Sequence, residues 1–385
     1  MKVLFPFVGD SIGGSHWSAI NLYKELVRRP EVDPIIVLHI LDGPLSKLLD
    51  RLSIPYTIFP VTRLAGGSDK ILSIAISMAT NLLSIYRFIK DNEVDIVHGN
   101  DLRINLTWSL PVKLSLSKYI WHQRQLFSKS SKWNFIKFLS DYVISISMYV
   151  HKTLPANISD NRKSIVNNPF DISTFYDKKK SRAAVCLEFR IDPSCFLLGY
   201  VGRLVSWKDI DTILYSLHEI LLLTSYKLNI HLIIVGDGDH QYKQLLASII
   251  KSNRLEEYVT FTGFIDNAPY TLSAIDLLVA SSVNEPFGRV LVESILQKTL
   301  VLASNSGAHG SIIKHNKTGI LFEVSSINSL SCNILDIIKN KRDYDYITDL
   351  AYDNAIKLYP SSVHADSIVN IYKHLLKVRV DLISH

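Results

Sequence analysis

The sequence predicts an α/β protein made of two doubly wound domains, and three observations support this prediction. Short apolar runs alternate with segments of helical apolar spacing over nearly the whole length, and this alternation is typical of parallel sheets with crossover helices. A polar and basic stretch interrupts the alternation near the middle of the chain, and the pattern then starts again. The length of 385 residues fits two domains of roughly 180 residues each.

The apolar runs give the expected strands in order. In the first half these runs are Lys2–Val8, Pro34–Ile40, Tyr56–Val61, Val94–His98, Tyr119–His122 and Val143–Ile146. In the second half they are Cys195–Val201, Ile230–Val235, Val259–Thr262, Leu277–Ala280, Leu300–Ala303 and Gly319–Phe322. The helical segments between them provide the crossovers that parallel strand pairing requires.

The interruption near the middle places the domain boundary. It runs from Asn167-Asn168-Pro169 to Asp177–Arg182, and we interpret it as a hinge and linker. Near the end of the chain, Tyr359-Pro360 breaks the helical pattern, because proline ends or kinks a helix. The helix after this break has to bury four apolar residues, so we expect it to cross back onto the first domain: Ile368, Ile371, Leu375 and Leu376. The expected parts are residues 1–170, 171–358 and 359–385.

Composition and cysteine content exclude several classes of protein. Hydrophobic residues make up 47% and charged residues 20%, with a net charge of +6, which excludes a disordered chain. The three cysteines, Cys186, Cys195 and Cys332, show neither disulfide-scaffold nor zinc-ligand spacing, which favours a reducing compartment. The first residues lead into a strand rather than a signal peptide, and the longest uncharged run, Ile71–Tyr86, is too short and polar to span a membrane. We therefore expect a cytoplasmic protein.

Two long cations follow the first strand of the second domain. Gly202-Arg203-Leu204 comes directly after Cys195–Val201, and Lys208 lies five residues beyond Arg203. Ligands bind at the carboxyl ends of strands in open parallel sheets, and an Arg fork with a Lys point charge suits a diphosphate. The alternative interpretation is a pair of solvated surface cations.

The stretch Glu285–Glu293 is the most informative part of the second domain. It follows the strand Leu277–Ala280, and a helix is expected to begin near Gly288. Glycine there lets a ligand approach the backbone N–H groups at the positive end of that helix, which is an anion site. Glu285 and Glu293 can face one ligand from its two ends, although each taken alone is also consistent with an ordinary helix residue.

Two features of the first domain are candidates for a site. Gly13-Gly14 follows the first strand and opens a helix without the Gly-Lys-Ser/Thr of a Walker loop. It is either a tight strand–helix turn or a loop that faces phosphate. His122 ends a predicted strand, and a single histidine in this position is structural unless other residues of a site accompany it.

A basic and aromatic stretch, Leu102–Ser140, carries seven cations and no acidic residue. This mixture suits an anionic membrane face and also suits nucleic acid. Part of the stretch has to be core, because Trp108, Tyr119 and Trp121 fall on predicted elements, and Ser128–Phe138 is the more surface-like piece. We expect peripheral contact with an anionic membrane and no nucleic-acid partner.

Taken together, these motifs resemble the retaining glycosyltransferases of the GT-B fold, family 4, the glycosyl transferases group 1. The matching pieces occur in the family's order: Gly13-Gly14, Asp95-Ile96-Val97-His98, Asn167–Asp171, Gly202–Lys208, Val235–Gly238, Phe261–Phe264, Glu285–Glu293 and Lys317-Thr318-Gly319. The resemblance implies two Rossmann-like domains facing each other across a cleft, with the acceptor on the first and the nucleotide-sugar on the second.

The resemblance also implies residue roles. Arg203 and Lys208 hold the donor diphosphate, Glu285 contacts the sugar hydroxyls and Glu293 binds the ribose. His122 hydrogen-bonds the donor sugar or the acceptor, so the implied catalytic set is Glu285, His122, Arg203 and Lys208. Further donor contacts are implied for Gly14, Gly263, Phe264, Ile265, Phe287, Gly288, Arg289 and Val290.

The partners follow from the same resemblance. It implies a UDP- or GDP-linked sugar donor, a glycan or lipid-linked acceptor in polysaccharide synthesis, and no cofactor or metal, since two cations and a helix dipole take the place of a divalent ion. One departure is Ser311, which stands where the family often has a Glu. A nucleotide-sugar epimerase of the same fold and a catalytically silent binding protein are the alternatives.

Overall fold

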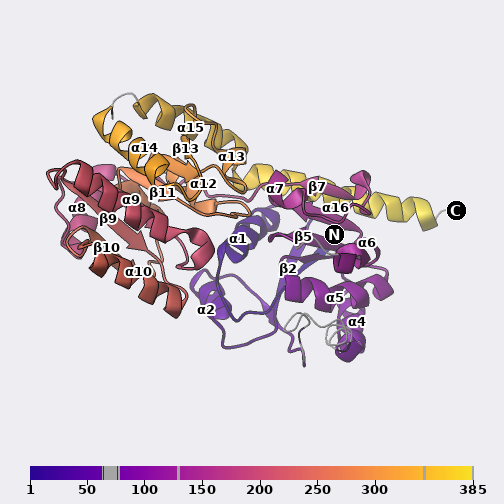
Figure 1. The fold of residues 1–385 in the computed structure, drawn as a ribbon. Coiled ribbons are helices and arrows are strands. Elements are labelled where there is room, and N and C mark those ends of the chain that lie inside the picture. The colour runs from indigo at the N-terminus through magenta and orange to yellow at the C-terminus, as the bar shows by residue number, and fades with distance from the viewer. Residues whose placement is uncertain (63, 65–75, 77–78, 128–130, 341–343, 384–385) are drawn as a thin grey trace. The chain divides into compact units, whose positions relative to one another are not determined.

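The computed structural model describes residues 1–62, 64, 76, 79–127, 131–340 and 344–383. The chain forms two compact units. Unit 1 comprises Met1–Asp171 with Tyr359–His385, and unit 2 comprises Ile172–Leu358 (Figure 1). The boundary expected after residue 170 lies one residue from this division.

Unit 1 is built around a parallel sheet in the order β3-β2-β1-β4-β5-β6-β7. Its strands are β1 (Lys2–Phe7), β2 (Asp33–Leu38), β3 (Thr57–Ile58), β4 (Ile96–Gly99), β5 (Lys118–Gln123), β6 (Tyr142–Ser145) and β7 (Lys163–Ile165). Its helices in the described part are α1 (Gly14–Val27), α2 (Pro44–Arg51), α4 (Leu82–Asp91), α5 (Leu102–Ser115), α6 (Ile136–Leu139), α7 (Met148–His151) and α16 (Ser361–Ile383).

Both faces of the unit 1 sheet are covered, as the apolar strands require. Val3 and Phe5 of β1 pack on one face in a cluster with α1, α2 and α16, whereas Leu4 packs on the other with α4 and α5. Residues next to each other in a strand point to opposite faces, so one strand supplies both cores. The four apolar residues that needed cover in α16 all pack in the first cluster: Ile368, Ile371, Leu375 and Leu376.

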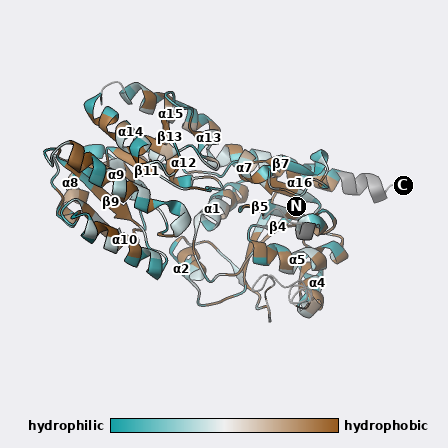
Figure 2. Cartoon of the chain, viewed as in Figure 1, coloured by the Kyte–Doolittle hydropathy of each residue, from teal (hydrophilic) through white to brown (hydrophobic). Residues whose placement is uncertain are grey.

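Unit 2 contains a second parallel sheet, in the order β10-β9-β8-β11-β12-β13. Its strands are β8 (Phe196–Val201), β9 (Ile230–Val235), β10 (Val259–Gly263), β11 (Leu277–Ala280), β12 (Leu300–Ser304) and β13 (Ile320–Phe322). Its helices in the described part are α8 (Lys178–Phe189), α9 (Ile210–Leu223), α10 (His240–Ser252), α11 (Ala268–Ala274), α12 (Arg289–Leu296), α13 (His309–Ile312), α14 (Ile327–Lys339) and α15 (Asp345–Leu358). Figure 2 shows hydrophobic residues along β9, whereas helices such as α8 and α10 carry both hydrophobic and hydrophilic residues.

The stretch Asp177–Arg182 corrects the linker interpretation, because it begins α8. The Asp177 carboxylate caps this helix by accepting the Lys180 N–H at 2.8 Å. Such a cap stabilises the helix because it satisfies a backbone N–H group that has no partner within the helix. Farther along the same helix, Arg182 Nη1 donates to Asp276 Oδ2 at 3.0 Å, which anchors the helix to unit 2. The positive charge of this stretch predicted a linker, but Arg182 instead forms an ion pair with Asp276 inside unit 2.

All twelve expected strands are present in the two sheets, and one further strand, β7, was not predicted. In each sheet the chain begins near the middle and then builds outward on both sides. The order therefore reverses between β1 and β4 in unit 1, and between β8 and β11 in unit 2. The carboxyl ends of such strand pairs form the crevice where ligands bind in doubly wound sheets.

Candidate active site

The order reversal of unit 2 brings the two predicted donor motifs together. Lys208 closes a short 3-10 turn after β8, and Glu285 lies in the loop after the neighbouring strand β11. The two loops are tied directly: Ser281 Oγ donates to the Lys208 carbonyl at 2.7 Å, and the Val283 N–H donates to the Trp207 carbonyl at 2.9 Å. The sheet and these bonds therefore fix both motifs in one place.

Lys208 and Glu285 form an ion pair at this point. Lys208 Nζ contacts Glu285 Oε2, and the two side chains are 13% and 12% exposed. Ser282 Oγ also donates to Glu285 Oε2 at 3.2 Å. Burial alone would raise the pKa of the Glu285 carboxyl, but Lys208, the nearby His309 and the Ser282 hydroxyl together lower the pKa below its ordinary value. The carboxylate is therefore ionised at neutral pH.

Two glycines allow the backbone to close around Glu285. Gly307 has φ +59°, and a Cβ there would lie 2.5 Å from the Glu285 nitrogen. Gly288 has φ +91° and precedes α12, where a Cβ would lie 2.3 Å from Leu291 Cδ1. Neither position accepts a side chain without displacement, and positive φ favours glycine at both. The Ala308 N–H completes the closure by donating to the Glu285 carbonyl at 2.9 Å.

His309 is a buried site residue to which the sequence assigned no role. It is 1% exposed, and its Nδ1 lies 3.0 Å from the Ser304 carbonyl. Burial lowers the pKa of His309, although the Glu285 charge opposes this shift. The only signal in the sequence was the Gly-rich loop around Ser311, and Ser311 itself is exposed on α13.

Arg203 and Lys208 share the ring of Trp207. The Arg203 guanidinium carbon lies 5.9 Å and Lys208 Nζ 4.6 Å from the centroid of this ring. Arg203 is exposed, whereas Trp207 is half-buried. An aromatic face attracts cations within about 6 Å, so Trp207 holds two positive charges at the carboxyl end of β8.

The second predicted carboxylate, Glu293, forms an ion pair on α12. Arg289 Nη2 lies 3.2 Å from Glu293 Oε1, one helical turn away. These side chains are 17% and 24% exposed, so both can still be reached from solvent. Phe287 is buried, and Val290 is half-buried beside Arg289. The two carboxylates predicted to face one ligand thus each hold a cation of their own.

Gly263, Phe264 and Ile265 lie at the end of β10, at the edge of the unit 2 sheet. Phe264 is 74% exposed, and the Gly263 carbonyl accepts the Gly236 N–H at 2.8 Å. The strand order places β10 two positions away from β8, so these residues are separate from the Lys208–Glu285 pair. An exposed phenyl ring at this edge can stack on a planar group.

The order reversal of unit 1 lies beside the predicted Gly-rich turn. Gly14 begins α1 and is exposed, and the Gly13 N–H donates to His16 Nδ1 at 3.1 Å. At the same edge, Arg103 donates to both oxygens of Asp10, at 2.6 and 3.0 Å. The Arg103 hydrogen bonds hold the pKa of Asp10 below its ordinary value.

His122 lies inside unit 1 rather than at its surface. It is 1% exposed, and its Nδ1 lies 3.0 Å from His98 Nε2 and 3.4 Å from Arg124 Nη2. Burial and the Arg124 charge lower the pKa of His122 well below its ordinary value, so the ring is neutral. Within the described residues, His122 Nε2 is buried without a hydrogen-bond partner, which is uncommon for a buried polar atom.

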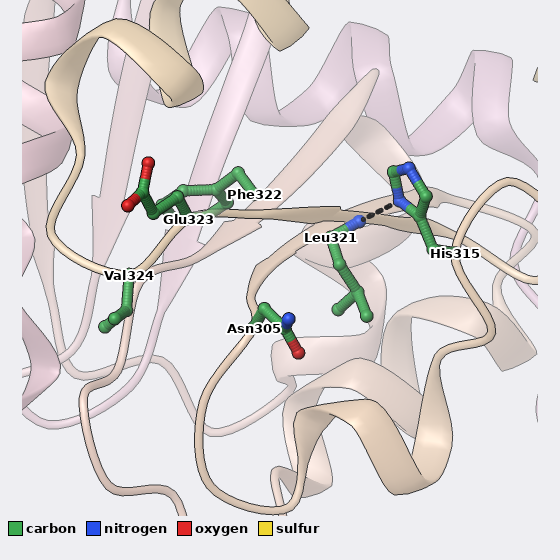
Figure 3. A pocket seen from close by; sticks show the side chains of 6 residues that line it. All are labelled: Asn305, His315, Leu321, Phe322, Glu323 and Val324. Carbon is green, nitrogen blue, oxygen red and sulfur yellow. Dashed lines mark hydrogen bonds between the residues drawn. The ribbon is translucent and has the colours of Figure 1, made fainter.

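A hollow of about 420 Å³ lies elsewhere in unit 2, along β13 (Figure 3). Asn305, Leu321 and Glu323 line it, and His315 Nδ1 accepts the Leu321 N–H at 3.0 Å. None of the predicted site residues belongs to it. Across the part of the chain that the structure describes, no group of three His, Cys, Asp or Glu side chains has a metal-binding arrangement.

The basic and aromatic stretch is more buried than expected. Trp108, Tyr119 and Trp121 are core residues, as predicted, but Trp133 is also buried because it packs against Phe127 at 4.9 Å between ring centroids. The interpretation of Ser128–Phe138 as a surface piece is therefore wrong for Trp133.

Other parts of the membrane interpretation are only partly covered by the structure. Phe138 is 65% exposed, with Lys137 Nζ 4.6 Å from its ring centroid. Lys129, the Lys132 side chain and residues 71–75, 77 and 78 of Ile71–Tyr86 lie outside what the structure describes. Among the described helices, none combines the length and hydrophobicity of a membrane-spanning segment.

Comparison with known proteins defines the class. The fold matches the structure of the Anabaena protein HepE in complex with UDP-glucose, with a TM-score of 0.84, 21% identity, and 97% and 100% of the two chains covered. It also matches WaaG, a glycosyltransferase involved in lipopolysaccharide biosynthesis, with a TM-score of 0.71, 13% identity, and 96% and 99% covered. The chain therefore has the GT-B fold.

The family follows from sequence. Residues 188–353 match the family model described as Glycosyl transferases group 1. The chain is 26% identical over 386 residues to the uncharacterized glycosyltransferase MJ1607 of Methanocaldococcus jannaschii, with 94% of each chain covered. It is 23% identical over 256 residues to N-acetyl-alpha-D-glucosaminyl L-malate synthase of Bacillus anthracis, covering 66% of this chain and 65% of that one. The similarity to group 1 glycosyltransferases therefore lies mainly in unit 2.

Proposed function

We propose that this enzyme transfers a hexosyl unit from a UDP- or GDP-linked sugar to a glycan or lipid-linked acceptor, with retention of anomeric configuration, in polysaccharide synthesis. The observation that carries the proposal is the Lys208–Glu285 pair at the order reversal of unit 2, with Arg203 exposed beside it. Structural neighbours that contain UDP-glucose or take part in lipopolysaccharide biosynthesis support the donor and the pathway.

The cations bind the donor diphosphate in this proposal. Arg203 supplies an exposed guanidinium, and Lys208 adds a second charge next to the same Trp207 ring. The first N–H groups of α12, after Gly288, point their positive dipole at the same anion. Diphosphate competes with Glu285 for Lys208, so donor binding frees the carboxylate to accept hydrogen bonds from the sugar hydroxyls.

The reaction retains configuration by attack on the face that the leaving group departs from. The acceptor oxygen bonds to the anomeric carbon, the bond from that carbon to the phosphate oxygen breaks, and the acceptor proton passes to the departing phosphate. Arg203 and Lys208 stabilise the negative charge that develops on the nucleotide. Glu285 is ionised, so it contributes negative charge near the positive anomeric carbon and does not supply a proton.

The remaining predicted residues bind the rest of the donor. Glu293 accepts hydrogen bonds from the ribose hydroxyls, and Phe264 with Gly263 and Ile265 lies beside the base. In unit 1, Gly14 approaches the phosphates, and His122 bonds the sugar or the acceptor. The proposal requires no cofactor and no divalent ion, because fixed cations and the α12 dipole provide the positive charge.

A donor panel tests the proposal. The protein should show a thermal shift with one or two of UDP-glucose, UDP-galactose, UDP-N-acetylglucosamine and GDP-mannose, and it should release the nucleotide in the presence of EDTA. Lys243→Ala is the matched control for Lys208→Ala, because Lys243 also pairs with an acid in unit 2 but is 39% exposed. A strict divalent-metal requirement, or no response to any donor, would contradict the proposal.

We also propose that unit 1 contacts the anionic cytoplasmic leaflet. Exposed apolar and cationic side chains support this contact: Phe138 is 65% exposed next to Lys137, and Leu116 at the end of α5 is 69% exposed. Lys113 on the same helix is tied to Asp141, close to α6, at 3.1 Å. Such a surface combines apolar insertion with charge attraction.

Vesicle sedimentation tests this contact. Wild type should bind phosphatidylglycerol vesicles more than neutral vesicles at about 0.1 M salt, where the electrostatic screening length is about 10 Å. The double variant K137E/F138D should lose binding and keep its nucleotide response, whereas Lys298→Glu in unit 2 should bind like wild type. Equal binding to neutral vesicles, or binding retained in the double variant, would favour a soluble acceptor.

A further inference from the structure

A chain of hydrogen bonds connects the C-terminal helix of unit 1 to His122. Tyr372 of α16 lies with its hydroxyl 2.6 Å from His98 Nδ1 on β4. His98 Nε2 lies 3.0 Å from His122 Nδ1 on β5. All three side chains are at most 1% exposed, so water does not replace any of these partners. The chain ends at His122 Nε2, the buried nitrogen without a partner among the described residues.

Arg124 determines the direction in which the protons point. Its Nη2 lies 3.4 Å from His122 Nδ1, and a guanidinium can only donate. His122 Nδ1 is therefore the acceptor, and it also accepts from His98 Nε2–H. His98 Nδ1 is then unprotonated and accepts the Tyr372 hydroxyl hydrogen. In a neutral imidazole only one nitrogen carries hydrogen, so the proton of His122 is on Nε2.

The surrounding residues hold Arg124 and the His122 ring in place. Arg124 donates from Nε and Nη2 to Asn100 Oδ1, at 3.0 and 2.7 Å, and from Nη1 to Asn168 Oδ1 at 2.7 Å. The ring of His364 on α16 stacks on His122 with 6.2 Å between centroids and 16° between planes. The helix α16 thus supplies the first member of the chain, Tyr372, and its His364 contacts the His122 ring at the other end.

We propose that Tyr372 and His98 are positioning residues that, together with Arg124, hold His122 with its Nε2–H as a hydrogen-bond donor to an oxygen of the bound sugar or acceptor. This proposal rests on the role given to His122 in the proposed function. It assigns His122 to neutral recognition of a hydroxyl or ether oxygen. It excludes His122 as the base that removes the acceptor proton, because Nε2 already carries hydrogen and Nδ1 is occupied.

The proposal also gives α16 a part in the site. Tyr372 is 274 residues from His98 in the chain, so this contact depends on the packing of α16 against unit 1. Tyr23 on α1 provides a matched control, because it is buried in the same apolar cluster as Tyr372 but is not part of the hydrogen-bond chain. Tyr372→Phe and Tyr23→Phe each remove one hydroxyl group from the same cluster, but only the Tyr372 hydroxyl contacts His98.

Nitrogen NMR of the full-length chain tests the proton positions without any substrate. In histidine-labelled protein, long-range proton–nitrogen correlations should show His98 and His122 both protonated at Nε2 and not at Nδ1. In Tyr372→Phe the His98 Nδ1 resonance should move because it loses its donor, and Tyr23→Phe should leave it unchanged. His122 protonated at Nδ1, or His98 signals that ignore Tyr372→Phe, would overturn the proposal.

Kinetics of the same two variants test the consequence. Tyr372→Phe should lower kcat about fivefold, as expected for one weakened hydrogen bond, with the KM for the donor nucleotide within twofold and a modestly lowered melting temperature, because buried His98 Nδ1 loses its donor. Tyr23→Phe should match wild type. A wild-type kcat in Tyr372→Phe would overturn the positioning role. If wild type transfers from no nucleotide-sugar, the proposed function fails, and the NMR result still decides the proton positions.

Discussion

The two units differ in how they hold polar groups at the carboxyl ends of their strands. Unit 2 uses charges in pairs: Lys208 with Glu285 after β8 and β11, and Arg289 with Glu293 on α12. Unit 1 buries neutral imidazoles in a hydrogen-bond chain, with His122 at its end. A cation held by a carboxylate can exchange partners with a phosphate, whereas a neutral imidazole N–H suits an uncharged hydroxyl. The difference matches the two ends of a nucleotide-sugar reaction.

The same difference sets the cost of disturbing each site. Removing one member of a buried ion pair leaves an uncompensated charge, which is strongly destabilising. Removing one member of a neutral chain leaves a single unsatisfied group, which costs about 1–3 kcal/mol. The comparison therefore predicts larger effects in unit 2 than in unit 1, and the experiments below follow that order.

Lys208→Ala should have the largest effect. It removes charge from the leaving diphosphate, where preorganised groups contribute about 2.7–4 kcal/mol, so kcat should fall about 10²–10³-fold. It also leaves Glu285 buried without its cation, so the melting temperature should fall too. Nucleotide release and thermal unfolding measure both effects. Activity within threefold of wild type would contradict the role of Lys208, and Lys243→Ala controls for loss of a surface charge.

The two carboxylates should separate in a nucleotide titration. Glu293→Gln should weaken binding of free UDP or GDP about tenfold to a hundredfold, because a ribose hydroxyl loses a charged acceptor contributing about 1.5–3 kcal/mol. Glu285→Gln should bind the free nucleotide like wild type, or tighter, because Lys208 is released to the diphosphate. Calorimetry measures both affinities. Equal losses in the two variants would contradict the division between sugar and ribose.

Acid should destabilise unit 1 through its buried histidines. Their surroundings are His98 on β4, His122 on β5, Arg124 after β5, and His364 and Tyr372 on α16. Burial lowers the pKa of His98 and of His122 well below the ordinary value of 6.5. The unfolded chain then binds more protons than the folded one, so stability is present above about pH 6.5 and is lost as the pH falls below it, by up to about 1.4 kcal/mol per pH unit for each ring.

Thermal unfolding between pH 7.5 and pH 5.5 checks this expectation. His98→Gln should flatten the fall of the unit 1 transition, since one titrating ring is gone and a neutral amide replaces it. The exposed His315 of unit 2 gives a control, because His315→Gln should leave that pH dependence unchanged. A transition that does not move with pH in wild type would show that the rings bind protons equally in the folded and unfolded states, which would contradict the lowered pKa values.

Strands and strand ends could be predicted from the sequence, and long-range partners could not. The apolar runs identified the strands because buried parallel strands are nearly continuous in hydrophobicity. The pairing of Lys208 with Glu285 joins residues 77 positions apart and depends on β8 lying beside β11. The chain from Tyr372 to His122 likewise depends on α16 packing on unit 1, so local spacing indicated His122 but not its partners.

The wrong predictions have the same physical origin. Asp177–Arg182 was interpreted as a linker from its charge, but Asp177 caps α8 and Arg182 finds Asp276 on the neighbouring segment. Trp133 was placed on a surface piece, but it packs against Phe127. Composition describes how soluble a segment is, whereas burial depends on which neighbours the fold supplies.

The anomeric configuration of the product tests the central claim most directly. Proton NMR of the reaction with an α-linked nucleotide-sugar and its acceptor should show an α-linked product with wild type. The signal should be lost in Lys208→Ala and should persist in Lys243→Ala. A β-linked product, or full transfer by Lys208→Ala, would contradict an account in which charges at the order reversal of unit 2 stabilise the departing nucleotide while the acceptor attacks from the same face.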